Sequence, residues 1–284
     1  MTDIAVSNHD GFNPWRFALY VCIAVVAGLF ILPTVGITLA AFKPGDEIAA
    51  GDLWSLPNSL YLGNFTDVLA NPWVKGYFVN TFLVAIPASL ASIFLGFLAG
   101  WVFAKLPFRG SEAVFMLLIS GIFFPPQVIL IPLFKMFDRM GMIDTLWPMI
   151  IVHTALGIPI CTLLMRNFFS AVPNALREAA LVEGVSEWQV LTRIALPLSL
   201  PAVAVLATLQ FTWIWNDFLW PLIFTQSEDV RTVMLGIVFL RGEYEVAWGA
   251  QGALALLSSL PTLVVFLFFQ RYFIQGLTMG AVKG

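Results

Sequence analysis

Charge is what this 284-residue sequence has least of: Asp, Glu, Lys and Arg make up 11% of it, against about 25% in a typical soluble domain. Hydrophobic residues make up 60%, and the mean hydropathy is +0.89. A chain of this length cannot bury so much apolar surface in a soluble core. The composition therefore excludes a soluble globular enzyme and a disordered chain, and it predicts a polytopic membrane protein.

Residues that carry chemistry are also scarce, with two His and two Cys in the whole chain. Cys22 and Cys161 lie in apolar stretches, where small membrane residues are expected rather than a disulfide or redox pair. His9 and His153 are isolated in the sequence, with no zinc-ligand spacing, paired carboxylates or nucleophile elbow around them. We therefore predict no catalytic residue and no metal site.

The chain also lacks a nucleotide site and a nucleic-acid surface. Residues 280–283 resemble part of the phosphate-binding loop G-x-x-x-x-G-K-[ST], but the spacing and the following Ser or Thr are missing. The formal net charge is -3, and no long Lys/Arg cluster is present. Both observations argue against a nucleic-acid partner.

Long apolar stretches are abundant, and about 20 such residues suffice for a helix to cross the hydrocarbon core. Six stretches qualify, and lipid cannot satisfy free backbone groups, so we predict an all-α membrane protein with six transmembrane helices. The predicted spans are Phe17–Phe42, Gly76–Ala104, Ala113–Phe134, Thr145–Met165, Ile194–Asn216 (with an apolar continuation to Phe224) and Val246–Gln270.

An even number of helices places both termini on one side of the membrane. If that side is the cytoplasm, the inside segments carry eight Lys and Arg residues and the outside segments six, the sign that the positive-inside rule requires. We therefore predict cytoplasmic termini. The expected organisation is a cytoplasmic tail (1–16), a first span with its external loop (17–75), a five-helix core (76–274) containing a cytoplasmic loop (166–196), and a C-terminal tail (275–284).

Proline and glycine predict two features within the spans. Pro125 and Pro126 are expected to break the third span near its middle, because proline cannot continue the hydrogen-bond ladder. Gly96 and Gly100 place two glycines on one face of the second span, where another helix can approach closely. Internal packing and contact with a second subunit explain this spacing equally well.

The loop 166–196 has its own helical pattern. Pro173 is suited to open a helix over 174–183, which Gly184 ends. Ser186 and Gln189 have the spacing of a capping box that starts a second helix, and the prolines at 197 and 201 are expected where the fifth span begins. The pattern predicts helix, glycine turn and helix at the membrane surface. The small Ala179 and Ala180 beside Leu176 are expected to give the first helix a low-profile face that fits a groove of a partner.

The same loop resembles the EAA loop of bacterial ABC importer permeases. The matching positions run from Glu178 to Pro197, and Glu183 stands where the family usually has Asp, which preserves the charge. They are Glu178, Ala179, Ala180, Glu183, Gly184, Ile194, Leu196 and Pro197. In that family the loop forms the coupling helix, which docks in a cleft of the cytoplasmic ATPase subunit.

Two further segments are similar to the permeases of maltose- and glycerol-phosphate-type importers. One is Trp215-Asn-Asp-Phe-Leu-Trp-Pro221 in the fifth span, and the other is the ending 271–284. The resemblance extends from about Asn64 to the C-terminus. It implies the type I ABC importer permease fold and a multi-pass protein of the bacterial inner membrane.

The resemblance also implies a set of partners. They are a second homologous permease, a dimer of ATP-binding subunits that holds ATP and Mg, and an extracytoplasmic solute-binding protein that delivers a sugar-like solute. This chain would bind no cofactor itself. Sugar sites favour aromatic faces with hydrogen-bonding groups, so the candidates for the solute path are Asn80, Gln127, Gln210, Trp213 and Asn216. Each of them would serve equally well to satisfy a kinked backbone.

Asp217 supports the alternative function, that of an ion-coupled secondary transporter, because an intramembrane carboxylate is costly and usually functional. However, it lies roughly one bilayer thickness of helix beyond Arg193, near the far interface. We therefore interpret Asn216 and Asp217 as structural caps or as groups at a cavity mouth.

Overall fold

The computed structural model describes residues 14–51, 54–240 and 247–281, with side chains as far as Tyr272, and its regular elements over these residues are all helical. The long helices are α1 (Pro14–Ala41), α4 (Val74–Lys105), α7 (Trp147–Ala171), α10 (Leu196–Trp215) and α13 (Trp248–Ala281). Shorter α-helices are α2 (Gly45–Ala49), α3 (Gly63–Ala70), α5 (Ser111–Ser120), α6 (Leu130–Arg139), α8 (Asn174–Val182), α9 (Glu187–Val190), α11 (Leu219–Phe224) and α12 (Val233–Phe239). Single turns are η1 (Gly121–Phe123), η2 (Pro126–Ile129), η3 (Leu191–Ala195) and η4 (Glu228–Val230).

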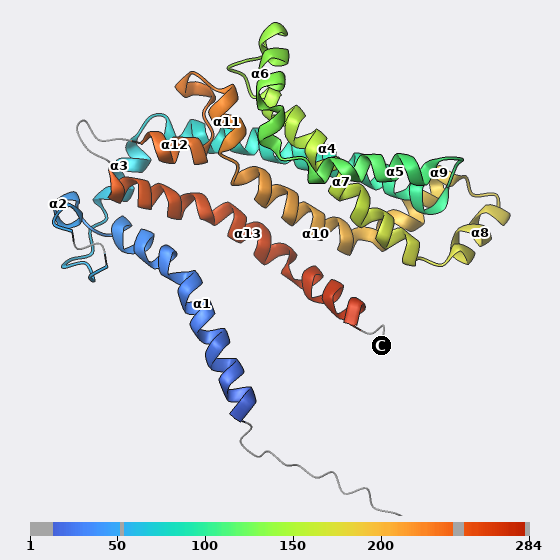
Figure 1. Cartoon of the computed structure of the whole chain (residues 1–284), viewed down its shortest axis with the longest axis horizontal. Coiled ribbons are helices and arrows are strands. Elements are labelled where there is room, and N and C mark those ends of the chain that lie inside the picture. Colours follow the sequence, from blue (N-terminus) through green and yellow to red (C-terminus); the bar gives the residue numbers. More distant parts are fainter. Residues whose placement is uncertain (1–13, 52–53, 241–246, 282–284) are drawn as a thin grey trace, which may run out of the picture.

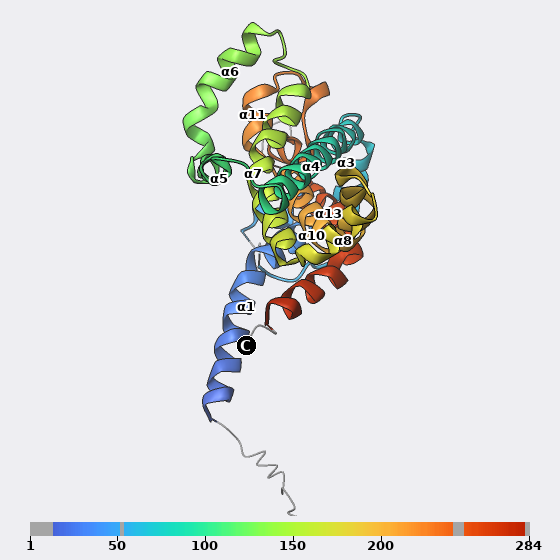
Figure 2. The same cartoon turned by 90° about the vertical axis from the view of Figure 1, so that its right-hand side faces the viewer.

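Five helical segments of the described chain are long and apolar enough to cross a membrane, and a bent pair supplies a sixth span if it is counted as one. That pair, Ser111–Phe123 and Pro126–Arg139, is bent by 93°. The bend lies at the predicted position, because Pro125 is extended and Pro126 has no N–H group to continue the ladder. Figure 2 shows α5 and α6 standing out beside α7 as a result.

The second and fourth spans, α4 and α7, make the most extensive helix contact in the described chain. A Cβ atom added to Gly96 would lie 2.3 Å from the Cβ of Cys161, and one added to Gly100 would lie 2.6 Å from the Cβ of Met165. Only glycine allows this approach. The glycine pair therefore serves internal packing, the first of the two explanations for its spacing.

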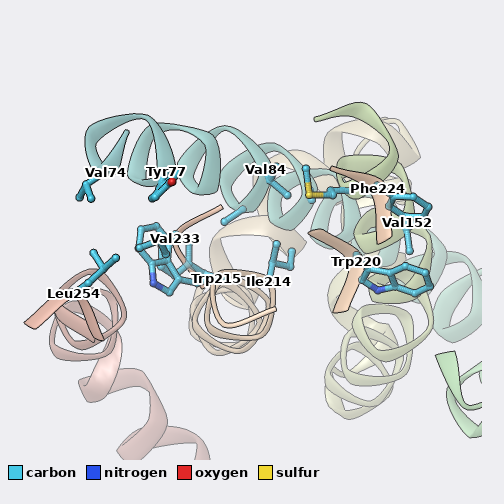
Figure 3. Close-up of a cluster of buried hydrophobic side chains, with 14 of the residues drawn as sticks. Val74, Tyr77, Val84, Val152, Ile214, Trp215, Trp220, Phe224, Val233 and Leu254 are labelled. Atoms are coloured by element: carbon cyan, nitrogen blue, oxygen red, sulfur yellow. The ribbon is translucent and has the colours of Figure 1, made fainter. Parts of the chain in front are cut away.

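The main core lies where α4, α7, α10, α11, α12 and α13 meet (Figure 3). Trp215, fully buried at the end of α10, donates from its indole Nε1 to the carbonyl of Ser258 on α13 at 2.9 Å. Trp220 and Phe224 stack on α11. A second cluster, around Phe169 and Trp101, extends to the loop that contains α8 and α9.

The first span diverges from the bundle. Along α1, only Gly36, Ala40 and Ala41 are buried, near its C-terminal end. Its contact is with α13, and Figures 1 and 2 show the rest of α1 pointing away from the other helices. This helix thus adds an apolar surface and contributes to the main core only at its last residue, Ala41.

One sequence expectation, the start of the fifth span, needs correction at its boundary. The fifth span does not begin anew at the prolines, because α9 continues through the π-helical turn η3 into α10, as one helical segment over Glu187–Trp215. The expected C-terminal tail over 275–284 is helical as far as Ala281, as part of α13. The expected start of the last span at 246, and most of the N-terminal tail, lie outside the described residues.

Candidate functional site

The loop that connects α7 to α10 folds as two short helices, at the right-hand end of Figure 1. Pro173 precedes α8, which ends in a Schellman motif: Gly184 donates to the carbonyl of Leu181 at 3.0 Å and Val185 to that of Ala180 at 3.0 Å. Gly184 has φ +83°, a conformation that side chains rarely adopt. The glycine is thus required by backbone geometry, since no atom lies within 4 Å of where its Cβ would be.

The predicted capping box starts the second helix. The backbone N–H of Gln189 donates to the hydroxyl of Ser186, and the Gln189 side chain accepts from the backbone N–H of Ser186 at 3.0 Å. An ion pair between Arg177 on α8 and Glu187 on α9 joins the two helices. The loop is therefore an ordered pair of helices and not an irregular surface segment.

The residues of the EAA-like pattern point in different directions. Glu178, Ala179, Glu183 and Gly184 are exposed, whereas Ala180 is 8% exposed and packs in the second cluster. The prediction that Ala179 and Ala180 share one low-profile face is wrong, because consecutive positions on a helix are about 100° apart and Ala180 faces the bundle.

The outward face of α8 is apolar as well as small. Val182, which follows Ala179 by one turn, is 88% exposed, and Leu176 is 47% exposed. Near the start of the fifth span, Ile194 is partly buried against the second cluster, while Leu196 and Pro197 are exposed. The loop thus presents an uncovered apolar surface at its tip and packs against the bundle at its base.

The candidates for the solute path do not form one site. Asn80 donates through its amide Nδ2 to the carbonyls of Asp229 and Arg231, at 2.7 and 3.0 Å, which is a structural role. Gln127 is exposed on η2, at the bend of the third span. Asn216 is also exposed, and its amide donates to Thr212 in its own helix.

Gln210 and Trp213 are the two candidates that the structure brings together. With His153 and Gly157 they line a cavity of about 20 Å³ between α7 and α10, enough for about one water molecule. Gln210 is 4% exposed and donates from Nε2 to the carbonyl of Gly157 at 3.4 Å. Trp213 is 64% exposed and supplies an aromatic surface beside this polar group.

His153 is a neighbour of Asp217, which the sequence analysis missed when it treated the histidine as isolated. Its Nε2 lies 3.3 Å from Oδ2 of Asp217, and both side chains are largely covered. Asp217 also accepts from the backbone N–H groups of Leu219 and Trp220, so it caps α11, as predicted. The sequence does indicate such a contact, because ionisable residues in membrane spans usually pair with one another.

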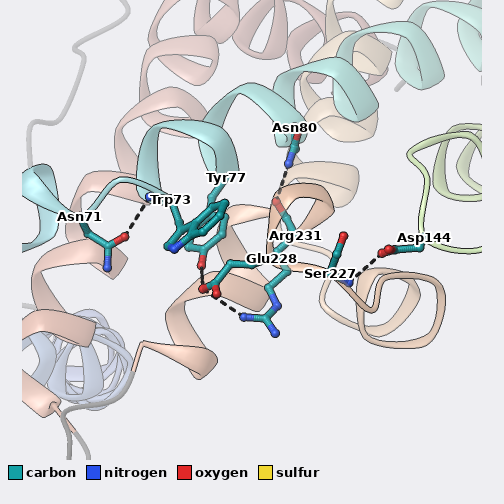
Figure 4. A network of polar contacts seen from close by, with 8 residues as sticks. All are labelled: Asn71, Trp73, Tyr77, Asn80, Asp144, Ser227, Glu228 and Arg231. Atoms are coloured by element: carbon teal, nitrogen blue, oxygen red, sulfur yellow. Dashed lines mark hydrogen bonds and ion pairs between the residues drawn. The ribbon is translucent and has the colours of Figure 1, made fainter.

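A polar network that the sequence analysis did not find holds the segment 225–232 at the opposite end of the bundle (Figure 4). Tyr77 donates its hydroxyl to Glu228 Oε1 at 2.6 Å, and Glu228 pairs with Arg231 at 3.2 Å. Asn80 binds the backbone on either side of Val230. Segments far apart in the sequence are joined here.

Asp144 completes this network from the turn before α7. Its Oδ1 accepts from the backbone N–H groups of Gln226 and Ser227, each at 2.8 Å. These bonds, that from Ser227 above all, hold the pKa of the Asp144 carboxyl below its usual range, against the effect of partial burial. The charged carboxylate is therefore part of the folded structure.

The cysteines and the other potential metal ligands of the described residues are dispersed. Across these residues, no three His, Cys, Asp or Glu side chains are grouped as a metal site would require. Both cysteines are free, Cys22 exposed and Cys161 buried. The two elements with the clearest functional geometry are the α8–α9 loop and the surfaces of α7 and α10 beside Gln210.

Residues 92–279, which include this loop, match the family of binding-protein-dependent transport system inner membrane components. The chain belongs to this family. It is the membrane-embedded permease of an ABC transport system and not an enzyme, since ATP hydrolysis in such systems is carried out by a separate subunit.

Curated relatives extend the match over almost the whole chain. The osmoprotective compounds uptake permease protein GgtD of Synechocystis sp. is 32% identical, over 94% of this chain and 92% of its own length. The arabinooligosaccharides transport system permease protein AraQ of Halalkalibacterium halodurans is 30% identical, over 92% and 94%. These matches cover more of the chain than residues 92–279 of the family match.

A solved structure agrees with the fold. It is a crystal structure of a bacterial ABC transporter involved in the import of the acidic polysaccharide alginate, with a TM-score of 0.77 and 20% identity, and it covers 93% of this chain and 99% of that one. The predicted fold class, that of an ABC importer permease, is confirmed.

Proposed function

We propose that this permease forms the translocation path for a sugar or sugar-like solute in a bacterial ABC importer. The support is the agreement among relatives: AraQ is named for arabinooligosaccharides, and the 27% identical SmoH of Agrobacterium fabrum for sulfoquinovosyl glycerol. The aromatic face of Trp213 beside the amide of Gln210 is chemically suited to a sugar ring. Calorimetry with the cognate solute-binding protein against a panel of sugars and polyols tests the solute class directly.

The proposed assembly contains four further components. A second homologous permease lines the path with this chain, two cytoplasmic subunits bind ATP and Mg, and a solute-binding protein docks from outside. A solved relative of 17% identity is described as a bacterial alginate ABC transporter in complex with a pentasaccharide-bound periplasmic protein. The proposed location is the inner membrane, with both termini and the α8–α9 loop in the cytoplasm.

In the proposed mechanism, α8 is the element that the ATPase moves. The observation that carries this proposal is the exposed apolar tip formed by Ala179 and Val182, flanked by the carboxylates of Glu178 and Glu183. An apolar patch with a polar rim is typical of a protein–protein contact. Closure of the ATP-bound dimer would displace α8 and reorient the spans, so that the path opens alternately to each side.

Two substitutions test this docking. Gly184→Asp places a side chain at φ +83° and a charge beside the tip, and Glu178→Lys reverses a charge. We expect both variants to fold and insert, but to lose the ATPase in pull-down and to lose uptake in parallel. Matched controls are Gly141→Asp, at another open glycine with positive φ, and Asp67→Lys, at an exposed position of α3. Normal uptake and full ATPase retention in both loop variants would contradict the proposal.

Orientation needs a separate measurement. In a background without the two native cysteines, Ser186→Cys should react with an impermeant thiol reagent only from the cytoplasm, and Asp229→Cys only from outside. These positions lie at opposite ends of the bundle, on the capping box and in the polar network. The reversed pattern would contradict the proposed topology.

A further inference from the structure

Lys105, the last residue of α4, carries a charge in an enclosed position that the mechanism above does not use. The residue is 8% exposed. Its Nζ donates to the carbonyl of Val172 at 2.6 Å and to Oδ1 of Asn174 at 2.7 Å. A buried ammonium is costly unless its N–H groups are hydrogen-bonded, so these two acceptors account for its position.

The two acceptors lie on either side of Pro173. Val172 directly follows α7 and Asn174 begins α8, and the intervening backbone is extended, with ψ 129° at Val172 and 134° at Pro173. The residue before a proline avoids the helical region, so α7 cannot continue as a helix into α8. This joint would be free to change its angle, but one ammonium group binds both of its sides.

The elements around the joint are themselves rigid. The glycine contacts at Gly96 and Gly100 interlock α4 with α7, so Lys105 attaches α8 to this helix pair. On its other side, α8 is joined by the ion pair from Arg177 to Glu187, at the start of the segment that runs into α10. The short helix α8 is thereby connected to three spans through two polar contacts.

We propose that Lys105 is a positioning residue for energy coupling: it fixes the angle at Pro173, so that a displacement of α8 moves the α4–α7 pair instead of bending the joint. This inference rests on the proposed function, in which the ATPase docks on α8. It assigns to Lys105 no role in docking itself, since its ammonium group faces the joint and not the exposed tip.

The test uses the complete transporter in proteoliposomes, with Lys105→Met as the variant and Lys75→Met as the matched control. Lys75 is exposed, near the other end of the same helix. We expect Lys105→Met to retain the ATPase and its basal hydrolysis, while solute uptake per ATP hydrolysed falls by about fivefold or more. Lys105→Arg, which keeps the charge and the donors, should retain most of the coupling.

Two results would overturn the inference. One is an unchanged ratio of uptake to hydrolysis in Lys105→Met, and the other is a loss of ATPase binding in proportion to the loss of uptake. If the transporter with Lys105→Met does not assemble, Asn174→Ala is the second variant. It removes one of the two acceptors of Lys105 and lies at an exposed position. An unchanged ratio of uptake to hydrolysis in Asn174→Ala would also overturn the inference. Failure of the docking proposal is recognised separately, by ATPase retention and normal uptake in Gly184→Asp and Glu178→Lys.

Discussion

The hydrogen bonds that shape the two ends of the bundle differ in sequence range. At the coupling end, formed by α8 and α9, the turn and the capping box join residues at most five positions apart, as in the bond from Val185 to Ala180. At the network end, formed by the segment 225–232 and its partners, the bonds from Tyr77 and Asn80 connect residues 149 to 151 positions apart. Local bonds make one end a unit that can move as a whole, whereas long-range bonds fasten several elements to one another.

This difference matches what each end is proposed to do. The coupling end presents an apolar tip and is joined to the bundle by few polar contacts, which suits an element that transmits a displacement. The network end holds one segment from two sides, through α4 and through Asp144, which suits a fixed platform. Between them, α4 and α7 interlock in the most extensive helix contact of the described chain.

The largest effect is expected from breaking the connection between the two ends. Gly96→Leu would push a side chain into the backbone of α7, where the nearest atoms lie 2.3 to 2.9 Å from the added Cβ. We expect a loss of about 3 kcal/mol of stability, because overpacking a tight contact forces backbone shifts. Gly76→Leu, at an open position of the same helix, is the control. Its free energy of unfolding in detergent should stay within about 1 kcal/mol of that of the wild type. Equal stability of the two variants would contradict the tight packing.

A smaller effect is expected at the network end. Asn80→Ala leaves the carbonyls of Asp229 and Arg231 without their donor, in a position where the amide is 9% exposed. A lost hydrogen bond to a buried group costs about 1–3 kcal/mol, so thermal unfolding in detergent should shift accordingly. Asn216→Ala, which loses one bond within its own helix, is the stability control. A shift no larger than that of the control would show that the network is not needed for stability.

At the coupling end, Gly184→Ala should cost about 1 kcal/mol, because alanine must adopt the left-handed backbone of the helix stop. No atom is close enough to clash, so the effect is purely one of backbone conformation. The matched control, Gly76→Ala inside α4, should change stability in the opposite direction. Alanine has a higher helix propensity than glycine, so this variant should be more stable than the wild type. Denaturation of both variants in the same detergent measures the two shifts, and a loss in both would contradict the backbone explanation.

The smallest effect is expected for Asp144→Asn, and it depends on pH. Because the folded-state pKa of this carboxyl is lowered, its stabilising contribution is present above the unfolded value of about 3.9 and is lost as pH falls through the folded value. The wild type should therefore be slightly more stable than the variant at pH 7. The difference should begin to decrease below about pH 4 and vanish once the pH lies below the folded value. A difference that is constant with pH would mean that the charge plays no part.

Much of this protein was predictable from sequence because its signals are local or compositional. The spans follow from the length of the apolar stretches, and the break at Pro125–Pro126 follows from the missing N–H of proline. The end of α8 at Gly184 and the capping box at Ser186 depend on residues a few positions apart, so both can be predicted from the sequence. The family resemblance rests on these same local patterns, and the family match confirms it.

What only the tertiary structure decided is which distant residues meet. Which of Ala179 and Ala180 faces the bundle depends on how α8 packs against the second cluster. The contact between His153 and Asp217 depends on the crossing of α7 and the α10–α11 junction, and the partners of Asn80 and Lys105 depend on where other chain segments end. A hydrogen bond acts only over about 3 Å, so no pattern within one segment reveals its partner on another. The sequence thus determined the helices and their local stops, and packing alone determined the polar contacts that join them.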